Sequence, residues 1–271
     1  MLPGDLSRFV ARHFGARGRA WLERVPELVD GIAAGWGLEI EHALGGGLLS
    51  CVLAAHTRDG EPVVLKIAGP WVAADHEAAA LAHWDAGPAP RLLGFDEDRS
   101  ALLLERIWPG GTVPDESCDR VAQLITALHA LPPTSTHIAS LPSLDEVIEE
   151  RLATAGAEAA ARSAAESAAQ ALRLQRARAA ARDLLSGYAG PSVLLHGDLE
   201  QRNVLRCQRP VLAAIDPMPC IGDPAYDAAY WAAEGRETVG VVQRCQSLAV
   251  HMRLDPVRVW RWASIIMLAL E

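Results

Sequence analysis

The stretch from His196 to Asp216, HGDLEQRNVLRCQRPVLAAID, is more informative about the fold than any other part of the chain. Asp198 and Asn203 are five residues apart, and Asp216 follows thirteen residues later. Two short apolar runs, 204–205 and 211–215, flank a polar interruption, a pattern that predicts a small β-hairpin leading to Asp216. Such a hairpin would bring oxygen-bearing side chains to one point, where they could bind hard cations such as Mg²⁺.

This spacing is typical of a catalytic loop followed by a metal-binding aspartate in protein-kinase-like phosphotransferases. Phosphoryl transfer requires an acceptor hydroxyl in line with the phosphate and neutralisation of the phosphate charge. We therefore predict that Asp198 is catalytic, orienting the acceptor hydroxyl and taking its proton. Asn203 and Asp216 are the predicted Mg²⁺ ligands, and His196 is expected to brace the loop. The alternative for the tripeptide HGD alone is an ordinary turn in which the aspartate caps a helix.

A glycine-rich stretch lies between two strand-like runs, 39–43 and 51–57. Gly45, Gly46 and Gly47 have no Cβ atoms to obstruct the approach of backbone amides to a phosphate, so they are candidate ATP-binding residues. The alternative is an ordinary hairpin turn, because many hairpins contain glycine.

A lysine interrupts the apolar strand-like run PVVLKI, residues 62–67. We predict that Lys66 faces the ATP phosphates and that Glu77, on a helix over 73–84, pairs with it. The alternatives are an edge-strand lysine that extends its ammonium group to solvent, and a glutamate on a solvated helix face.

The run 102–107, LLLERI, precedes Trp-Pro-Gly-Gly and predicts a buried strand that runs into a turn. In a two-lobed kinase this is the hinge, where backbone groups of Glu105, Arg106 and Ile107 would bind the adenine edge. The alternative for this run alone is a buried core strand that ends at the following Pro-Gly turn.

Together these segments, with HGDL, AIDP and GDPAYD, resemble the aminoglycoside phosphotransferase family, whose fold is similar to that of protein kinases. Similarity to its streptomycin 6-phosphotransferase and hydroxyurea phosphotransferase branch lies in GRAWLERVPELVDGIAAGWGLEI, IDPMPCIGDPAYD and LDPVRVWRWA. The resemblance implies a two-lobed α+β fold. Residues 1–104 would form a nucleotide-binding lobe with leading helices and an antiparallel sheet, and 105–271 a mainly helical catalytic and substrate-binding lobe.

The resemblance also implies roles for individual residues. Lys66 would contact the α- and β-phosphates, and Asp227 would steady the catalytic loop from the start of the next helix. Pro217 and Met218 follow Asp216 where a protein kinase has Phe-Gly, so we expect no activation-loop switch. Amphipathic patterns predict further helices over 16–36 and 119–131. High helix propensity predicts one or two long helices within 144–186, and the apolar run 260–270 predicts another helix.

Composition favours an enzyme of the cytoplasm. Hydrophobic residues make up 50% of the 271 residues, enough for a sizeable core. No run approaches the roughly 18 to 20 uncharged apolar residues needed to cross a bilayer, and residues 1–15 lack the apolar core of a signal peptide. We therefore expect no membrane partner. The five cysteines show no CxxC spacing, so we expect reduced thiols.

The formal net charge of −9 disfavours nucleic acid and favours a cationic substrate, although acidic character also serves solubility alone. Glu234 and Trp231, in GDPAYDAAYWAAEG, are candidate substrate contacts; helical spacing offers core packing as the alternative for Trp231. We expect a monomer.

The resemblance implies ATP- and Mg²⁺-dependent phosphorylation of an aminoglycoside hydroxyl, with streptomycin at its 6-hydroxyl as the first candidate. A second hypothesis is a metabolic kinase acting on a sugar, choline-like or homoserine-like alcohol. A third is a nucleotide-binding pseudokinase that serves as a scaffold, although a scaffold has no use for both metal ligands.

Overall fold

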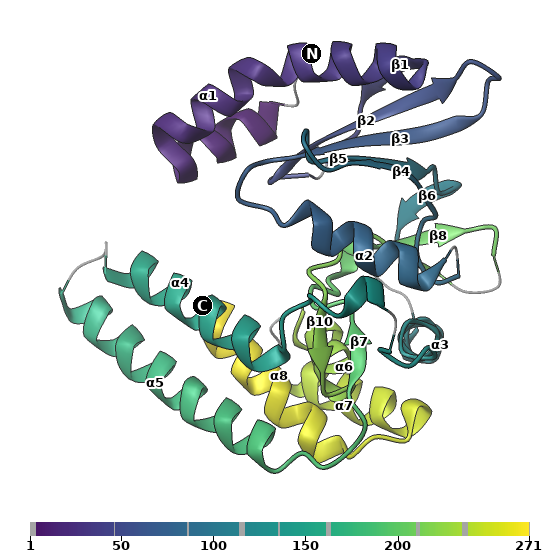
Figure 1. Cartoon of the computed structure of the whole chain (residues 1–271). Helices are drawn as coiled ribbons and strands as arrows, with labels where there is room; N and C mark the ends of the chain where they lie inside the picture. Colours follow the sequence, from purple (N-terminus) through teal and green to yellow (C-terminus); the bar gives the residue numbers. More distant parts are fainter. Residues whose placement is uncertain are drawn as a thin grey trace. The chain divides into compact units, whose positions relative to one another are not determined.

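The computed structural model describes residues 4–45, 47–85, 87–113, 117–134, 136–160, 164–209, 212–234 and 238–270. The chain divides into two compact units, Met1–Gly110 and Gly111–Glu271. A five-stranded antiparallel sheet forms the centre of the first unit, and helices dominate the second (Figure 1). The two-part α+β architecture expected from the sequence, with an antiparallel sheet in the first unit and a mainly helical second unit, is therefore confirmed.

The division falls at Gly110 rather than after residue 104. Strand β5 (Ala101–Glu105) explains the difference, because its last residue is still part of the sheet of the first unit. Glu105 pairs with Val63, and its N–H donates to the Arg91 carbonyl at 2.9 Å. A short strand, β6 (Pro109–Thr112), spans the boundary.

The sheet of the first unit has the strand order β1-β2-β3-β5-β4. Its other strands are β1 (Leu38–Ala43), β2 (Ser50–Thr57), β3 (Pro62–Ala68) and β4 (Leu92–Asp96). Lys66 of β3 lies opposite Val52 on one side and Leu102 on the other. Because β3 is flanked on both sides, the alternative of an edge-strand lysine is wrong.

A long N-terminal helical segment, α1 (Gly4–Trp36), covers this sheet with the apolar side chains Leu6, Val10, Trp21, Val25 and Ile32. The helix predicted over 16–36 is only its second arm. Gly15 has φ 52° and breaks the helix, as a residue without a Cβ atom can at low cost. The arms before and after Gly15 pack closely against each other, since a Cβ on Gly18 of the second arm would lie 2.5 Å from the Val10 carbonyl oxygen of the first.

Helix α2 (Ala74–Trp84) follows β3 and carries Glu77. It ends where Asp85 adopts a left-handed conformation and its N–H donates to the Leu81 carbonyl. Acidic residues in its first turn suit the positive end of the helix dipole. The helix predicted over 73–84 is thus confirmed to within one residue.

The second unit contains two short pairs of antiparallel strands. Strand β7 (Val193–Leu195) pairs with β10 (Cys220–Gly222), and β8 (Val204–Cys207) pairs with β9 (Ala213–Ala214). The second pair is the hairpin predicted between Asn203 and Asp216. A 3₁₀ turn, Gln201–Asn203, leads into β8. The hairpin therefore joins the two candidate metal ligands directly.

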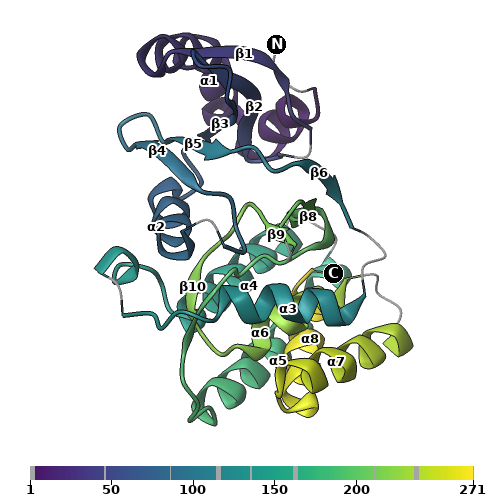
Figure 2. The ribbon, with the colours of Figure 1, turned by 90° about the vertical axis from the view of Figure 1, so that its right-hand side faces the viewer.

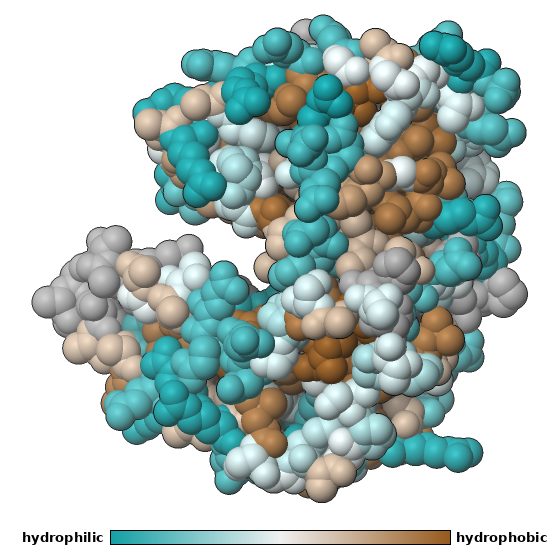
Figure 3. Space-filling model, in the orientation of Figure 1, coloured by the Kyte–Doolittle hydropathy of each residue, from teal (hydrophilic) through white to brown (hydrophobic). Residues whose placement is uncertain are grey.

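Helices make up the rest of the second unit. They are α3 (Cys118–Leu128), α4 (Leu144–Ala160), α5 (Ala164–Ser186), α6 (Ala225–Ala233), α7 (Thr238–Met252) and α8 (Pro256–Leu270). Helices α4 and α5 form an antiparallel pair, and α8 packs against both α5 and α6 (Figure 1). Half of the side chains between residues 168 and 186 of α5 that are not buried are polar, and hydrophilic side chains along this helix are visible in Figure 3.

Helix α6 lies at the centre of the second unit, in contact with α3, α7 and α8 (Figure 2). Every residue of α6 is buried, and its sequence, AYDAAYWAA, combines small alanines with large aromatic rings. Tyr226 packs edge-on against Trp262 of α8, with ring centroids 5.5 Å apart. A helix buried on all sides is a rigid base for the polar side chain that it carries, Asp227.

No helix among the described residues is both long and apolar enough to cross a membrane. All five cysteines are free thiols in the structure.

Candidate active site

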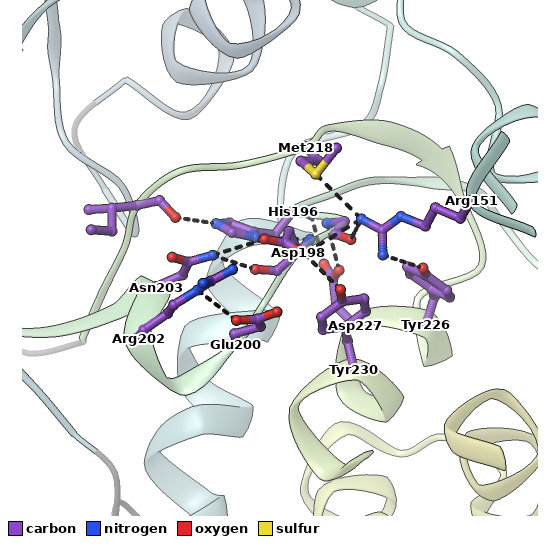
Figure 4. Close-up of polar contacts among 12 residues, drawn as sticks. Arg151, His196, Asp198, Glu200, Arg202, Asn203, Met218, Tyr226, Asp227 and Tyr230 are labelled. Atoms are coloured by element: carbon purple, nitrogen blue, oxygen red, sulfur yellow. Dashed lines mark hydrogen bonds and ion pairs between the residues drawn. The ribbon is translucent and has the colours of Figure 1, made fainter. Parts of the chain in front are cut away.

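The catalytic loop predicted from the sequence begins directly after β7. Both oxygens of the Asp198 carboxylate accept hydrogen bonds: Oδ1 from the Tyr230 hydroxyl at 2.7 Å, and Oδ2 from Asn203 Nδ2 at 3.1 Å. Asn203 Nδ2 also donates to the Asp198 carbonyl at 2.9 Å. Figure 4 shows the Asn203 amide with its nitrogen toward Asp198 and its oxygen on the opposite side. Asn203 Oδ1 is thus available to bind a hard cation.

Asp227 anchors this loop from inside the unit. Its carboxylate accepts the backbone N–H groups of His196 at 2.8 Å and Gly197 at 2.9 Å. His129 Nε2, from the end of α3, lies 2.9 Å from the same carboxylate. Burial opposes ionisation, but the hydrogen bonds from His129 and the Gly197 amide outweigh it and lower the pKa of Asp227.

His196 is fully buried and connects the catalytic loop to the strand that precedes Asp216. Its Nδ1 accepts the Asp198 N–H at 3.4 Å, and its Nε2 lies 3.0 Å from the Ile215 carbonyl. A neutral ring with its proton on Nε2 satisfies both contacts. Burial lowers the pKa of His196, in agreement with a neutral ring.

Asp216 lies just beyond β9 in the left-handed region, with φ 55°. The backbone holds it beside the catalytic loop: Ile215 N–H donates to the Asn203 carbonyl, and Met218 N–H to the His196 carbonyl, both at 2.9 Å. Gly197 is required at this crossing, because a Cβ there would lie 2.0 Å from the Met218 carbonyl oxygen. Non-glycine residues with positive φ are uncommon and often occur at functional sites.

The Asn203 amide oxygen and the Asp216 carboxylate fit Mg²⁺, which prefers oxygen ligands and takes others from phosphates and water. Within the described parts of the chain, no three His, Cys, Asp or Glu side chains converge as a denser metal-binding group. The donor set therefore suits a cation that arrives with a nucleotide, rather than an all-protein metal centre.

The first unit contains the ion pair predicted between Lys66 and Glu77. Lys66 Nζ donates to Oε1 of Glu77 at 2.7 Å and to Oε2 at 2.6 Å. The two side chains are only 5% and 3% exposed. The interpretation of Glu77 as a solvated surface residue is therefore wrong.

The glycine-rich stretch is described only in part, since Gly46 lies outside the described residues. A Cβ on Gly47 would lie 2.9 Å from the Ser50 carbonyl oxygen, whereas one on Gly45 would meet nothing within 4 Å. Of the two glycines that the structure describes, Gly47 is thus required by close approach of the protein itself, and the phosphate contacts of all three glycines stay a prediction.

The hinge residues have partners inside the first unit. Glu105 Oε2 accepts the Arg91 N–H at 3.1 Å, and Arg106 Nη1 donates to Glu41 Oε2 at 2.6 Å. Ile107 is buried. The Glu105 N–H is already used in the sheet, and the adenine contacts of Glu105, Arg106 and Ile107 stay a prediction.

Arg151 of α4 is part of the site, although nothing in the sequence indicates this role. Its Nη2 lies 3.6 Å from Asp198 Oδ1 and donates to the Gly197 carbonyl at 2.8 Å. The sequence likewise does not indicate that His129, at the end of α3, belongs to the site. Both residues are far from the HGD motif in the sequence, and each lies in an ordinary helical pattern that predicts packing alone.

The two candidate substrate contacts have other roles in the structure. Trp231 is 2% exposed and packs in the core, as its helical spacing allowed. The Glu234 carboxylate accepts the Gln201 N–H at the end of the catalytic loop, and the Glu234 carbonyl accepts a hydrogen bond from Arg244. Burial raises the pKa of Glu234. Neither side chain is therefore assigned to substrate.

One unit thus has a strand lysine paired with a helix glutamate, and the other has an Asp-Asn-Asp set on a loop held by a buried aspartate. These are the parts of a protein-kinase-like phosphotransferase. Residues 36–268 match the model of the aminoglycoside/hydroxyurea antibiotic resistance kinases. The chain belongs to this family of kinases, which confirms the resemblance found in the sequence.

Characterised relatives cover nearly the whole chain. Streptomycin 6-kinase from Streptomyces griseus is 32% identical, over 96% of this chain and 86% of that protein. Hydroxyurea phosphotransferase from Kitasatospora aureofaciens is also 32% identical, over 96% of this chain and 76% of that protein. Among solved structures, a choline/ethanolamine kinase family protein from Mesorhizobium loti matches with a TM-score of 0.66 at 19% identity, covering 92% of this chain and 83% of that one. This last similarity shows the fold alone.

Proposed function

We propose that this kinase transfers the γ-phosphoryl group of ATP to a hydroxyl of an aminoglycoside, with streptomycin at its 6-hydroxyl as the substrate to test first. The observation that supports this most is the similarity of 96% of the chain to a streptomycin 6-kinase. That similarity includes the loop on which Asp198 and Asn203 are hydrogen-bonded to each other. A carboxylate in this position can take the proton of the hydroxyl that accepts the phosphoryl group.

Separate residues would bind the nucleotide, hold Mg²⁺ and accept the proton. Lys66, held by Glu77, would bind the α- and β-phosphates, and the backbone of residues 45–47 would cover the phosphates. Asn203 and Asp216 would hold Mg²⁺, which supplies positive charge beside the phosphates. Asp198 would orient the acceptor hydroxyl and accept its proton as the oxygen forms its bond to phosphorus and the bond to ADP breaks.

The consequence for a cationic antibiotic follows from charge. A phosphate adds about −1.5 to −2 charges at neutral pH and removes a hydroxyl donor. Such a product would bind poorly to the RNA that the unmodified drug contacts. The acidic net charge of −9 is compatible with a cationic substrate. We also propose that the enzyme acts as a monomer in the cytoplasm, where ATP is available, since one chain contains every residue named.

The metabolic-kinase hypothesis is not favoured. The match to a choline/ethanolamine kinase family protein is at 19% identity, whereas both antibiotic-directed relatives reach 32%. Retention of the lysine, the catalytic aspartate and both metal ligands also disfavours a scaffold.

Mass spectrometry of reactions containing the protein and MgATP tests the proposal. The acceptors are streptomycin, other aminoglycosides, hydroxyurea, choline and homoserine, and each product should gain ~80 Da. We expect phosphorylated streptomycin with the wild type and none with Asp198→Asn. Phosphorylated hydroxyurea or choline in place of streptomycin would overturn the substrate assignment.

A further inference from the structure

Arg151 is a half-buried cation that reaches Asp198 from α4, a helix that carries neither the catalytic loop nor Asp216. Its side chain is 22% exposed and that of Asp198 is 14% exposed, and Arg151 Nη2 lies 3.6 Å from Asp198 Oδ1. An arginine keeps its charge at any physiological pH. In a largely buried setting, salt screens such a pair much less than a surface pair.

Four other contacts fix the guanidinium group. Nη2 donates to the Gly197 carbonyl at 2.8 Å and lies 3.6 Å from the sulfur of Met218. Nη1 donates to the Tyr226 hydroxyl at 3.2 Å, and the group stands 5.1 Å from the centre of the Tyr230 ring. Figure 4 shows it between these partners. Arg151 thus connects α4 with the catalytic loop, the segment after Asp216, and α6.

Tyr230 approaches the same oxygen that Arg151 faces, and its hydroxyl donates to Asp198 Oδ1. Each carboxylate oxygen has about two acceptor sites. Tyr230 and Asn203 together leave acceptor capacity on Asp198 for a substrate hydroxyl while restricting rotation of the carboxylate. Arg151 Nη1 and Nη2 donate to Tyr226 and Gly197, which hold the guanidinium group beside Asp198 so that it acts through that carboxylate.

We propose that Arg151 is a positioning residue for phosphoryl transfer and that, with Tyr230, it holds the Asp198 carboxylate in the orientation that receives the acceptor hydroxyl. This inference rests on the proposed catalytic role of Asp198. It assigns to the alanine-rich helix α4 a part in the chemistry that its sequence does not suggest. An arginine is needed because only a planar fork can contact Gly197 and Tyr226 at once.

Steady-state kinetics of four single variants and one double variant test the inference. Arg151→Gln should lower kcat about 10²-fold, the effect expected when a reacting group is misplaced by about 1 Å. The KM values for ATP and streptomycin should change little, because the lost interaction serves the transition state. Arg151→Lys should recover part of kcat, since it restores the charge without the fork. Tyr230→Phe should also lower kcat, because it removes the hydroxyl that donates to Asp198 and keeps the aromatic ring.

The fourth variant, Arg178→Gln, is the matched control. Arg178 of α5 pairs at 2.6 Å with Glu149, two residues before Arg151 on α4, but its side chain is 33% exposed and it touches none of the loop. Its removal should leave kcat unchanged. Because Arg151 and Tyr230 act on one carboxylate, the double variant Arg151→Gln/Tyr230→Phe should lose less than the product of the two single losses.

The outcomes separate this inference from the proposed function. If the wild type does not phosphorylate streptomycin, the substrate proposal fails, and slow transfer of phosphate from MgATP to water then reports on the same carboxylate. The positioning role is overturned if Arg151→Gln keeps wild-type kcat, if only KM rises, or if kcat falls merely in proportion to unfolded protein. Should Arg151→Gln fail to fold, Arg151→Lys and Tyr230→Phe decide the question by the same criteria.

Discussion

Lys66 donates from its ammonium nitrogen to both carboxylate oxygens of Glu77, in the interior of the N-terminal unit. Lys66 is on the central strand β3 and Glu77 on the helix that follows. Bringing two charges out of water is costly, and the pair is tolerated because both carboxylate oxygens are used. The contact fixes the lysine nitrogen in one place, where it can bind phosphate oxygens of a nucleotide.

Removal of one partner of this pair should impair both stability and nucleotide use. Lys66→Met would leave the Glu77 charge buried without its partner, at a cost of about 3 to 5 kcal/mol. We also expect a large loss of kcat/KM for ATP in the protein that remains folded. Urea unfolding and initial rates at varied ATP measure the two effects.

The exposed pair of Arg99 with Asp96 is a suitable control, since the arginine side chain is 51% exposed. Arg99→Gln should change the free energy of unfolding by no more than about 1 kcal/mol. An unchanged kcat/KM for ATP in Lys66→Met would show that another residue positions the phosphates.

Asp198→Ala should separate nucleotide binding from transfer. Asp198 is hydrogen-bonded to Tyr230 and Asn203. Loss of a positioned acid–base group lowers transfer about 10² to 10⁴-fold. Calorimetric titration with MgATP should give wild-type affinity, because the lysine and both metal ligands are unchanged. Full residual activity would refute the catalytic assignment.

The two aspartates of GDPAYD should differ in their effects. Asp223 accepts from Arg258 Nε at 2.6 Å and from Trp262 Nε1 at 2.5 Å, so it joins α8 to the segment before α6. Asp227 instead holds the catalytic loop. Asp223→Asn should therefore destabilise the protein by about 1 to 3 kcal/mol, with kcat per folded molecule little changed. Asp227→Asn should lower kcat as well.

Thermal unfolding measures the loss of stability of each variant, and kcat per folded molecule measures the loss of activity. Together they distinguish the two variants. The comparison is well matched, since both residues are aspartates of one motif and both are buried. Equal effects on kcat would contradict the division of roles.

The stability of the protein should depend on the protonation of His196. Burial lowers its pKa below the ordinary 6.5, so the unfolded chain takes up a proton at a higher pH than the folded one. The contribution of the neutral ring is therefore fully present above pH 6.5 and is lost as the pH falls from 6.5 toward the folded-state pKa. A proton on Nδ1 would also oppose the Asp198 N–H.

Urea midpoints measured at several pH values on both sides of 6.5 test this dependence. His196→Gln should show a smaller slope below pH 6.5, because glutamine does not titrate. The matched control is His13→Gln, which removes an exposed histidine of α1 and should keep the wild-type slope. A wild-type slope in His196→Gln would assign the effect to another group.

The sequence by itself determined the parts of the protein that depend on short-range pattern. The hairpin between Asn203 and Asp216, the strand with Lys66 and the helix with Glu77 all lie within a few residues of their predicted positions. Local alternation and turn residues suffice to indicate such elements. The same short segments carried the family resemblance, because catalytic groups on one loop must keep fixed spacing.

The tertiary structure alone decided which distant side chains complete the site. Arg151 and His129 reach Asp198 and Asp227 across 47 and 98 residues of sequence, respectively, and nothing near them in the chain indicates this. It also decided that Trp231 packs in the core and that Glu105 belongs to the first unit. The physical reason is that hydrogen bonds and ion pairs depend on the positions of atoms in space. Those positions are set only when helices α3, α4 and α6 pack together.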